Sequence, residues 1–293
     1  MTARFHPCAL TIAGSDSGGN AGVQADLRAF HAYGVHGCTV FAALTAQNPF
    51  SVTAIHEVPA DFVAAQLDAV LGTYAIGALK TGMLSSAAVM EVVANRLERH
   101  PEIQKVVDPV MVATSGAKLI ADEAIMALTE RLLPLATLIT PNLPEAELLA
   151  GGTLDSSARS AGADHAEELA RELQRRFGCA VLVKGGHGEG DAAVDVLYDG
   201  MAVRRFAMPR IMNPVSTHGT GCSLAAALAA ELALGNDVPA AVAGAKTYVH
   251  EAVRRSYLVG ENCGVLGFAT RADIRQLTAG SLDANRHVEK PTA

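Results

Sequence analysis

The sequence predicts a three-layer α/β/α sandwich with a mostly parallel central sheet. The main observation is a repeated alternation between short apolar runs and longer stretches whose apolar residues recur at helical spacing. Strands that alternate with helices in this way form parallel sheets, and right-handed crossovers place helices on both faces. The composition agrees, because 50% of the 293 residues are hydrophobic and only 18% are charged, enough to bury a large core.

The first half of the chain begins with a buried apolar run, residues 9–13, and a glycine-rich loop from Gly14 to Gly22. The helix that follows ends before Gly34. Residues 52–57 fit either an edge strand or one arm of a hairpin. We expect strands at residues 9–13, 35–43, 52–57, 78–81 and 105–108, and helices at residues 23–33, 62–71, 87–97 and 122–132.

The second half continues the alternation and adds a hairpin. Residues 193–198 and 201–207 are joined across Asp199-Gly200, a dipeptide typical of tight hairpin turns. We expect further strands at residues 137–140 and 180–183, and helices at residues 144–149, at 166–177, from Cys222 onward, and from 238 to about 257. No linker or repeat divides the chain, so we expect one domain over residues 1–293, with a frayed tail at about 279–293.

Charge and cysteine content exclude several classes of protein. The net charge is −7, from 23 basic and 30 acidic residues, which argues against nucleic acid or an anionic membrane as a partner. The cysteines are odd in number and contain no C-x-x-C pair, so the spacing predicts neither a disulfide framework nor a zinc site. Together with the lack of a signal-peptide pattern, this favours the cytoplasm. The cysteines are Cys8, Cys38, Cys179, Cys222 and Cys263.

The most informative stretch is residues 217–223, a glycine turn that opens a helix of small residues. A helix start offers unpaired backbone N–H groups and a positive dipole end, and glycine lets a phosphate approach them closely. Cys222 lies at this mouth, where a helix N-terminus favours a thiolate that can deprotonate a hydroxyl. The alternative is a helix-terminating type of glycine turn beside a buried structural cysteine.

Polar residues follow several predicted strands at their carboxyl ends. In parallel sheets these ends meet at one edge, which is where ligands bind. The glycine-rich loop after the first strand fits neither a dinucleotide fingerprint nor a P-loop, so we interpret it as wrapping a small substrate, or as a plain turn. The other strand-end residues are Gln47, Asn48, Gly82, Met83, Asp108, Asn142, Glu145 and Lys184.

These residues suggest a phosphate site. Lys184 ends an apolar strand beside glycines, which favours a phosphate contact over a solvated lysine. Asp108 and Glu145 supply hard carboxylate oxygens of the kind that hold Mg²⁺. The alternatives are a loop carboxylate for Asp108 and a helix-dipole partner for Glu145. For His187 and His218 we expect no chemical role.

Taken together, seven segments resemble the hydroxymethylpyrimidine/phosphomethylpyrimidine kinases of thiamine biosynthesis, which belong to the ribokinase-like superfamily. Their order and spacing span residues 9 to about 248, so the combination is far more specific than any one motif. Asn20 and Ser216 depart from the family's usual residues. The segments are residues 13–26, 43–48, 80–84, 108–111, 139–146, 183–187 and 218–222.

The resemblance implies two successive reactions with ATP and Mg²⁺. The first phosphorylates the hydroxymethyl group of 4-amino-5-hydroxymethyl-2-methylpyrimidine, and the second converts that monophosphate to the diphosphate. By analogy, Gln47 binds the aminopyrimidine edge, Gly14 and Asp26 line the pocket, and Met83 and Val110 form its walls. The resemblance also suggests a homodimer.

The resemblance also assigns the phosphate end of the site. Cys222 is the implied base, and Gly219, Thr220 and Gly221 form the implied anion hole. Lys184 contacts the triphosphate, while Asn142 and Glu145 organise Mg²⁺ near Asp108. Thr217 and Lys246 are the remaining implied nucleotide contacts.

Two other functions remain open from the sequence. A pyridoxal or pyridoxine kinase is the nearer alternative, because related kinases with the same Gly-Thr-Gly-Cys ending phosphorylate similar rings. Gln47 favours the aminopyrimidine. A catalytically silent ligand sensor on the same fold is the other alternative, although the intact set of Lys184, Glu145, Gly219 and Cys222 argues against it.

Overall fold

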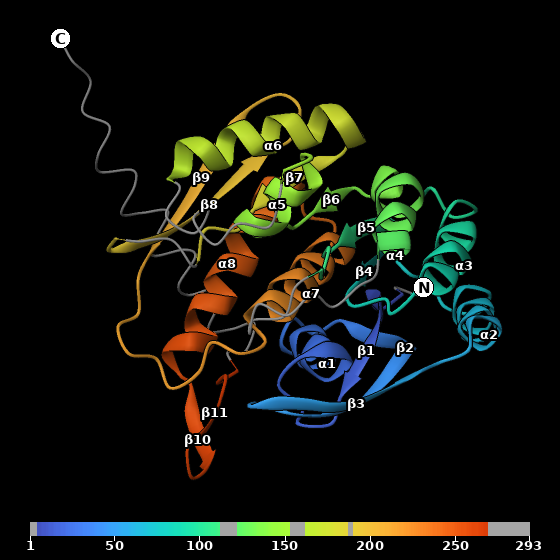
Figure 1. The fold of residues 1–293 in the computed structure, drawn as a ribbon, viewed down its shortest axis with the longest axis horizontal. Coiled ribbons are helices and arrows are strands. Elements are labelled where there is room, and N and C mark those ends of the chain that lie inside the picture. Colours follow the sequence, from blue (N-terminus) through green and yellow to red (C-terminus); the bar gives the residue numbers. More distant parts are fainter. Residues whose placement is uncertain (1–4, 112–121, 153–161, 187–189, 269–293) are drawn as a thin grey trace.

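A computed structural model describes residues 5–111, 122–152, 162–186 and 190–268. Its main feature is a nine-stranded sheet with the order β3-β2-β1-β4-β5-β6-β7-β8-β9 (Figure 1). The six strands from β2 to β7 pair in parallel, while β3, β8 and β9 pair antiparallel at the two edges. The strands are β1 (Cys8–Asp16), β2 (His36–Asn48), β3 (Ser51–Glu57), β4 (Ala78–Thr81), β5 (Gln104–Val107), β6 (Leu138–Ile139), β7 (Ala180–Val183), β8 (Ala192–Tyr198) and β9 (Val203–Pro209).

Helices cover both faces of this sheet, so the expected three layers are confirmed (Figure 1). Helices α2, α3, α4, α5 and α6 pack on one face, and α1, α7 and α8 pack on the other. The helices are α1 (Gly22–Ala32), α2 (Ala60–Leu71), α3 (Ala87–Leu97), α4 (Asp122–Ala127), α5 (Leu143–Leu149), α6 (Ala163–Phe177), α7 (Thr220–Ala233) and α8 (Val238–Arg254).

The sheet has a hydrophobic core on each of its faces, which explains why the central strands are continuous apolar runs in the sequence. Successive residues of a strand point to opposite faces, so Leu10 and Ile12 enter one core while Ala9 enters the other. Helix α7 is made largely of alanine, and Ala225 to Ala230 include no exposed residue. Small side chains let α7 lie close to the middle of the sheet, which places its N-terminus at the carboxyl ends of the strands.

Several element boundaries differ from the expectation. Strand β2 runs to Asn48, so Gln47 lies within a strand that pairs with β3, rather than after it. The expected helix over residues 122–132 is α4 followed by a π-helical turn, Leu128–Leu132. The last helix ends at Arg254, and the hairpin β10 (Tyr257–Gly260) and β11 (Cys263–Val265) follows it. The helix was expected to reach about residue 257 because the apolar spacing continues to that point. Tyr257 and the two residues after it are exposed, so this spacing does not reflect a buried helix face.

Among the described ranges, no helix combines the length and apolar character needed to cross a membrane. The tail expected at about residues 279–293 lies outside the described residues, as does His187.

Candidate active site

A cavity of about 450 Å³ lies at the carboxyl edge of the parallel strands, a size typical of small-ligand sites. Every site residue predicted from the sequence lines this cavity except Asp26. The lining therefore brings together residues from the first loop, from the ends of five strands, from the start of α7 and from α8. Those predicted are Gly14, Gln47, Met83, Asp108, Val110, Asn142, Glu145, Lys184, Thr217, Gly219, Thr220, Gly221, Cys222 and Lys246.

Asp26 lies beneath the cavity instead of in its wall. Its carboxylate accepts hydrogen bonds from Lys80 Nζ at 2.9 and 3.0 Å and from Thr11 Oγ1 at 2.6 Å. Both Asp26 and Lys80 are fully buried, because α1 presses this carboxylate against β1 and β4. The expectation that Asp26 lines the pocket is therefore wrong. Asp26 fixes Lys80, which does line it.

Lys80 is a buried cation that sequence reasoning missed. Burial lowers its pKa, but Asp26 and the neighbouring acidic groups outweigh burial, so the pKa of Lys80 rises above its usual value. The lysine therefore stays charged at neutral pH. The signal in the sequence was a lysine inside a short apolar strand run, where a lysine needs a buried partner.

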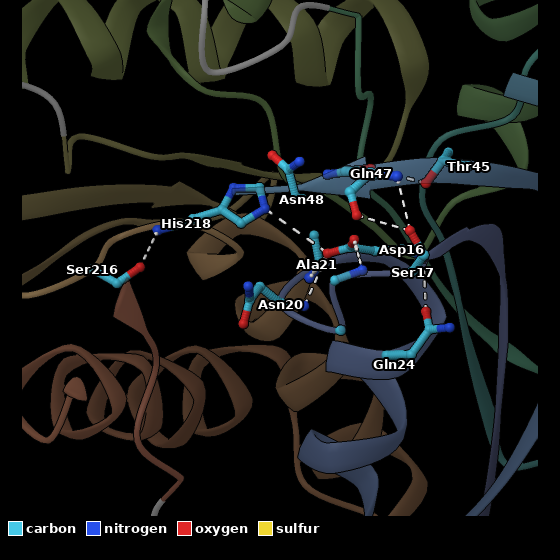
Figure 2. Close-up of polar contacts among 12 residues, drawn as sticks. Asp16, Ser17, Asn20, Ala21, Gln24, Thr45, Gln47, Asn48, Ser216 and His218 are labelled. Carbon is cyan, nitrogen blue, oxygen red and sulfur yellow. Dashed lines mark hydrogen bonds and ion pairs between the residues drawn. The ribbon is translucent and has the colours of Figure 1, made fainter. Parts of the chain in front are cut away.

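The first loop is organised around Asp16, which sequence reasoning also missed. Its carboxylate accepts hydrogen bonds from the backbone N–H groups of Gly18, Asn20 and Ala21, at 2.8, 2.9 and 2.8 Å (Figure 2). The Gln24 side chain accepts from the Asp16 N–H at 2.9 Å. These bonds close the loop before α1 begins and hold its backbone in one shape.

Gln47 lies beside this loop at the end of β2 (Figure 2). Its N–H donates to Ser17 Oγ, and Ser17 Oγ donates back to the Gln47 carbonyl, each at 2.8 Å. Thr45 Oγ1 donates to the Ser15 carbonyl at 2.7 Å and lies 3.1 Å from Gln47 Oε1. The backbone of Gln47 is thus anchored to the loop, and its side-chain amide lines the cavity.

The start of α7 packs directly on the first loop. Gly219 has φ +89°, and a Cβ at this position would lie 1.8 Å from the Asn20 carbonyl oxygen. Only glycine allows this conformation and this approach. Thr220 Oγ1 donates to the Thr217 carbonyl at 3.0 Å and closes the turn. The N-terminal backbone of a 14-residue helix therefore opens into the cavity beside the loop.

Cys222 is partly exposed on the cavity wall. Burial raises the pKa of its thiol; Lys80 and a backbone hydrogen bond from Gly22 lower it, but less, so the net direction is upward. This direction is opposite to the lowering of the thiol pKa that the helix start was expected to cause. Lys80 is the nearby cation that favours the thiolate when the proton leaves.

The opposite side of the cavity carries an ion pair between strand ends. Lys184 Nζ donates to Asp108 Oδ1 at 2.8 Å, and Thr140 Oγ1 donates to the same oxygen at 3.0 Å. Lys184 keeps 16% of its side chain exposed, whereas Asp108 keeps 4%. Asp108 therefore holds the Lys184 ammonium at the cavity wall, where it could contact a phosphate.

Glu145 and Asn142 form a capping box at the start of α5. Asn142 Oδ1 accepts from the Glu145 N–H, and a Glu145 carboxylate oxygen accepts from the Asn142 N–H, each at 2.9 Å. Burial raises the pKa of Glu145 to about 7, although Lys184 opposes this. The helix-start role considered for Glu145 is confirmed, and the carboxylate also lines the cavity beside Asp108.

A third lysine reaches the cavity from α8. Lys246 Nζ donates to Asp195 Oδ2 at 2.7 Å, and Asp195 Oδ1 accepts from the Gly185 N–H at 2.9 Å. Asp195 was missed by sequence reasoning because the hairpin strand that carries it has no site motif. It ties Lys246 to the glycine turn after Lys184, so the two lysines border one space.

His218, for which we expected no role, lines the cavity and places Nε2 3.9 Å from Asp16 Oδ2 (Figure 2). Ser216 Oγ accepts from the His218 N–H at 3.2 Å, so this serine is part of the turn before α7. Asn20 is buried and is not among the cavity-lining residues. Asn20 and Ser216, the two residues that differ from the family's usual ones, thus both lie where the first loop meets the turn before α7.

Comparison with known proteins agrees with this arrangement. A family model described as phosphomethylpyrimidine kinase matches residues 16–267. The hydroxymethylpyrimidine/phosphomethylpyrimidine kinase of Synechococcus elongatus is 48% identical over 262 residues, 89% of this chain and 97% of that protein. The thiamine biosynthesis bifunctional protein ThiED of Geobacter sulfurreducens is 46% identical over 264 residues. These cover 90% of this chain and 52% of that protein, so the chain spans about half of its length.

A solved structure supports the fold. The ADP complex of Bacillus subtilis pyridoxal kinase superposes with a TM-score of 0.81 at 34% identity, over 93% of this chain and 100% of that one. The ribokinase-like fold expected from the sequence is thereby confirmed. With the family model covering most of its length and the predicted motifs gathered around one cavity, this chain belongs to the phosphomethylpyrimidine kinase family.

Proposed function

We propose that this protein uses ATP to phosphorylate 4-amino-5-hydroxymethyl-2-methylpyrimidine, and then phosphorylates the monophosphate to the diphosphate. The observation that carries the proposal is the make-up of the cavity at the carboxyl edge of the sheet. A loop and Gln47 offer neutral hydrogen-bonding groups on one side, and Lys184 and Lys246 offer charges on the other. The start of α7, with Cys222, lies between them and is where the two substrates would meet.

The acceptor end suits a small aromatic ring. Gly14, Met83 and Val110 supply backbone and apolar surface, and the Gln47 amide supplies both a donor and an acceptor. An aminopyrimidine edge offers a ring-nitrogen acceptor and an amino donor in the same plane. One planar side-chain amide can pair with both groups, which favours the pyrimidine over an apolar ring of equal size.

The first step needs a base because a primary alcohol is a poor nucleophile at neutral pH. The Cys222 thiolate accepts the hydroxymethyl proton as the oxygen bonds to the γ-phosphorus of ATP, and the bond from that phosphorus to ADP breaks. Backbone N–H groups at Gly219 to Gly221 and the Lys184 ammonium stabilise charge on the transferred group. Because the pKa of Cys222 is raised, this step should accelerate as pH rises above neutrality.

The second step has a different acceptor. The monophosphate oxygen is already ionised at neutral pH, so no base has to remove a proton from it. Lys184 and the α7 N-terminus still stabilise the transferred group, whereas Cys222 is dispensable. One cavity therefore accounts for both reactions with unequal use of the same residues.

The residues present fit Mg²⁺. Asp108 and Glu145 both line the cavity, and carboxylate oxygens are the hard ligands that Mg²⁺ prefers. Together with Asn142 these groups would hold the ion and the nucleotide at the phosphate end. Bound Mg²⁺ supplies charge neutralisation on the phosphates.

Pyridoxal phosphorylation is the second candidate, since the superposed Bacillus subtilis structure is a pyridoxal kinase. An assay of ADP release with Mg-ATP would compare the hydroxymethylpyrimidine, its monophosphate and pyridoxal. Turnover of both pyrimidines with little on pyridoxal supports the proposal. Turnover of pyridoxal with an inert monophosphate contradicts it, and no ADP release with any of the three acceptors supports the sensor alternative.

We further propose a cytoplasmic homodimer in which one kinase domain makes up each chain. The edge strand β3 supports self-association, because all 7 of its residues are exposed and Phe50 beside it is 70% exposed. The free cysteines are consistent with a reducing compartment. Size-exclusion chromatography with light scattering tests the dimer, and a monomeric mass at micromolar concentration would contradict it.

A further inference from the structure

A second cluster of reactive side chains lies at the opposite end of the sheet from the active site. Cys8 begins β1 and pairs in register with His36, the first residue of β2. Cys38 lies two residues beyond His36, so strand alternation puts all three side chains on the same face of the sheet. Sequence spacing gave no hint of this cluster, because the residues come together only through parallel pairing of two strands.

The geometry of the cluster matches soft metal coordination. The Sγ atoms of Cys8 and Cys38 lie 3.6 Å apart. Two thiolates bound to one tetrahedral Zn²⁺ lie about 3.8 Å apart, since each Zn–S bond is about 2.3 Å. One ligand atom from each of Cys8, His36 and Cys38 lies within 4.8 Å of the others. The distance between the two sulfur atoms therefore already matches that of two thiolates on one metal ion. Only the exposed imidazole has to move inward.

The surroundings give access to the cluster and place an aromatic ring beside the imidazole. Both thiols are buried, with 5% and 7% of Cys8 and Cys38 exposed, whereas His36 is exposed. The His36 ring stacks on Tyr74 at a centroid distance of 5.7 Å, which limits its orientations. A surface hollow lined by His6, Cys8, His36 and Tyr74 opens onto the cluster. An ion can therefore reach Cys8 and His36 from the hollow, and His6 lies on the same side.

We propose that Cys8, Cys38 and His36 bind one divalent cation of the Zn²⁺ class, with the fourth position facing the hollow lined by His6. Binding replaces the two thiol protons, which pass to solvent, and leaves two thiolates and a neutral imidazole on the ion. Neither oxidation nor reduction is involved. The site is at the amino ends of β1 and β2, so its occupancy ties these two strands together away from the kinase cavity.

Cobalt(II) titration of the reduced, chelator-treated full-length protein tests this proposal. Thiolate-bound tetrahedral cobalt has intense visible bands and a sulfur-to-metal charge-transfer band. We expect one cobalt per chain with these bands, displaced by Zn²⁺. Cys179→Ala and Cys222→Ala are matched controls and should bind as the unmodified protein does, since neither residue is in the cluster.

Two variants separate metal binding from simple packing. Cys38→Ala should remove most of the charge-transfer intensity. His36→Ala changes an exposed side chain, so the variant folds, and it should weaken cobalt binding at least about tenfold. The proposal is overturned if the folded protein shows no thiolate bands, or if both variants bind as tightly as the controls. Formation of a Cys8–Cys38 disulfide in air, with no metal uptake by the reduced protein, also overturns it.

Discussion

The two ends of the active-site cavity are built in different ways. At the acceptor end, Asp16 holds three backbone N–H groups at 2.8–2.9 Å, and the Gln47 backbone is bonded to Ser17. At the phosphate end, Lys184 and Lys246 are each paired with an aspartate and also face the cavity. The acceptor end is a hydrogen-bonded frame built around one carboxylate, whereas the phosphate end carries paired charges on the cavity wall.

This difference suggests a division of roles. A rigid frame selects a molecule by shape and hydrogen bonding, because its groups cannot rearrange to suit another ring. Because Lys184 and Lys246 are each paired with an aspartate, neither charge lacks a partner before phosphate binds. Substitutions at the acceptor end should therefore change which molecule reacts, and those at the phosphate end should change how fast every acceptor reacts. Cys222 lies between the two ends and should affect one reaction only.

The largest effect is expected for Cys222→Ala. Loss of the base should lower the rate of hydroxymethylpyrimidine phosphorylation by about 10²–10⁴-fold, whereas the monophosphate reaction should change far less. Separate initial-rate assays with each acceptor at saturating Mg-ATP measure the two steps. Cys222→Ser should follow the same order. Equal losses in both steps would mean that the cysteine is mainly architectural.

Lys184→Ala should lower both reactions, by about 10²–10³-fold in kcat, because the ammonium acts on the transferred phosphoryl group whatever the acceptor. Lys246→Met is the matched substitution at the same end. Asp195 keeps its hydrogen bond from the Gly185 N–H in this variant, so the turn after Lys184 should stay in place. The substitution should therefore raise the KM for ATP more than it lowers kcat. A Lys184→Ala enzyme that lost only one of the two reactions would contradict the division of roles.

Gly219→Ala tests the contact between the two ends. The added Cβ meets the Asn20 carbonyl at 1.8 Å and also sits at φ +89°. Gly178→Ala is the control, with φ +75° but open space around the Cβ. We expect strain of about 1 kcal/mol in the control. Gly219→Ala should show a larger fall in Tm and at least a tenfold loss of activity, about the scale of a displaced catalytic group. Equal Tm changes and unchanged activity would show that the contact relaxes freely.

The smallest effect concerns Glu145 and pH. Burial raises the pKa of Glu145 to about 7, so the folded protein binds a proton that the unfolded chain releases near pH 4.5. The free energy of unfolding contributed by this group therefore falls as pH rises through that window. Glu145→Gln cannot ionise and keeps the capping box. The free energy of unfolding of Glu145→Gln, measured relative to the unmodified protein, should rise by about 1–3 kcal/mol as the pH goes from about 5 to about 8. A difference in Tm that is independent of pH would contradict this assignment.

Much of the fold followed from periodicity, and so did the edge of the sheet that holds the site. Helix α3 (Ala87–Leu97) and strand β7 (Ala180–Val183) match the expected bounds, because each has a single clear pattern between strong breakers. The end of α8 was misplaced, because the apolar spacing runs on into an exposed hairpin.

Side-chain partners were harder to predict than positions. Asp26 was expected in the cavity, yet the packing of α1 turns it toward Lys80, 54 residues away. The Asp195–Lys246 pair joins a hairpin strand to a late helix and leaves no trace in local spacing. Cys222 lines the cavity, but burial raises the pKa of its thiol, an effect that local spacing does not reveal. Pairing between distant residues depends on tertiary packing, which spacing along the chain does not encode.

The most direct test of the central claim is a time course with the hydroxymethylpyrimidine as sole acceptor and excess Mg-ATP, followed by phosphorus NMR. One cavity that performs both steps predicts that the monophosphate forms and then gives way to the diphosphate. Two ADP molecules should be released for each pyrimidine consumed. Accumulation of the monophosphate as the final product, with one ADP per pyrimidine, would contradict the account.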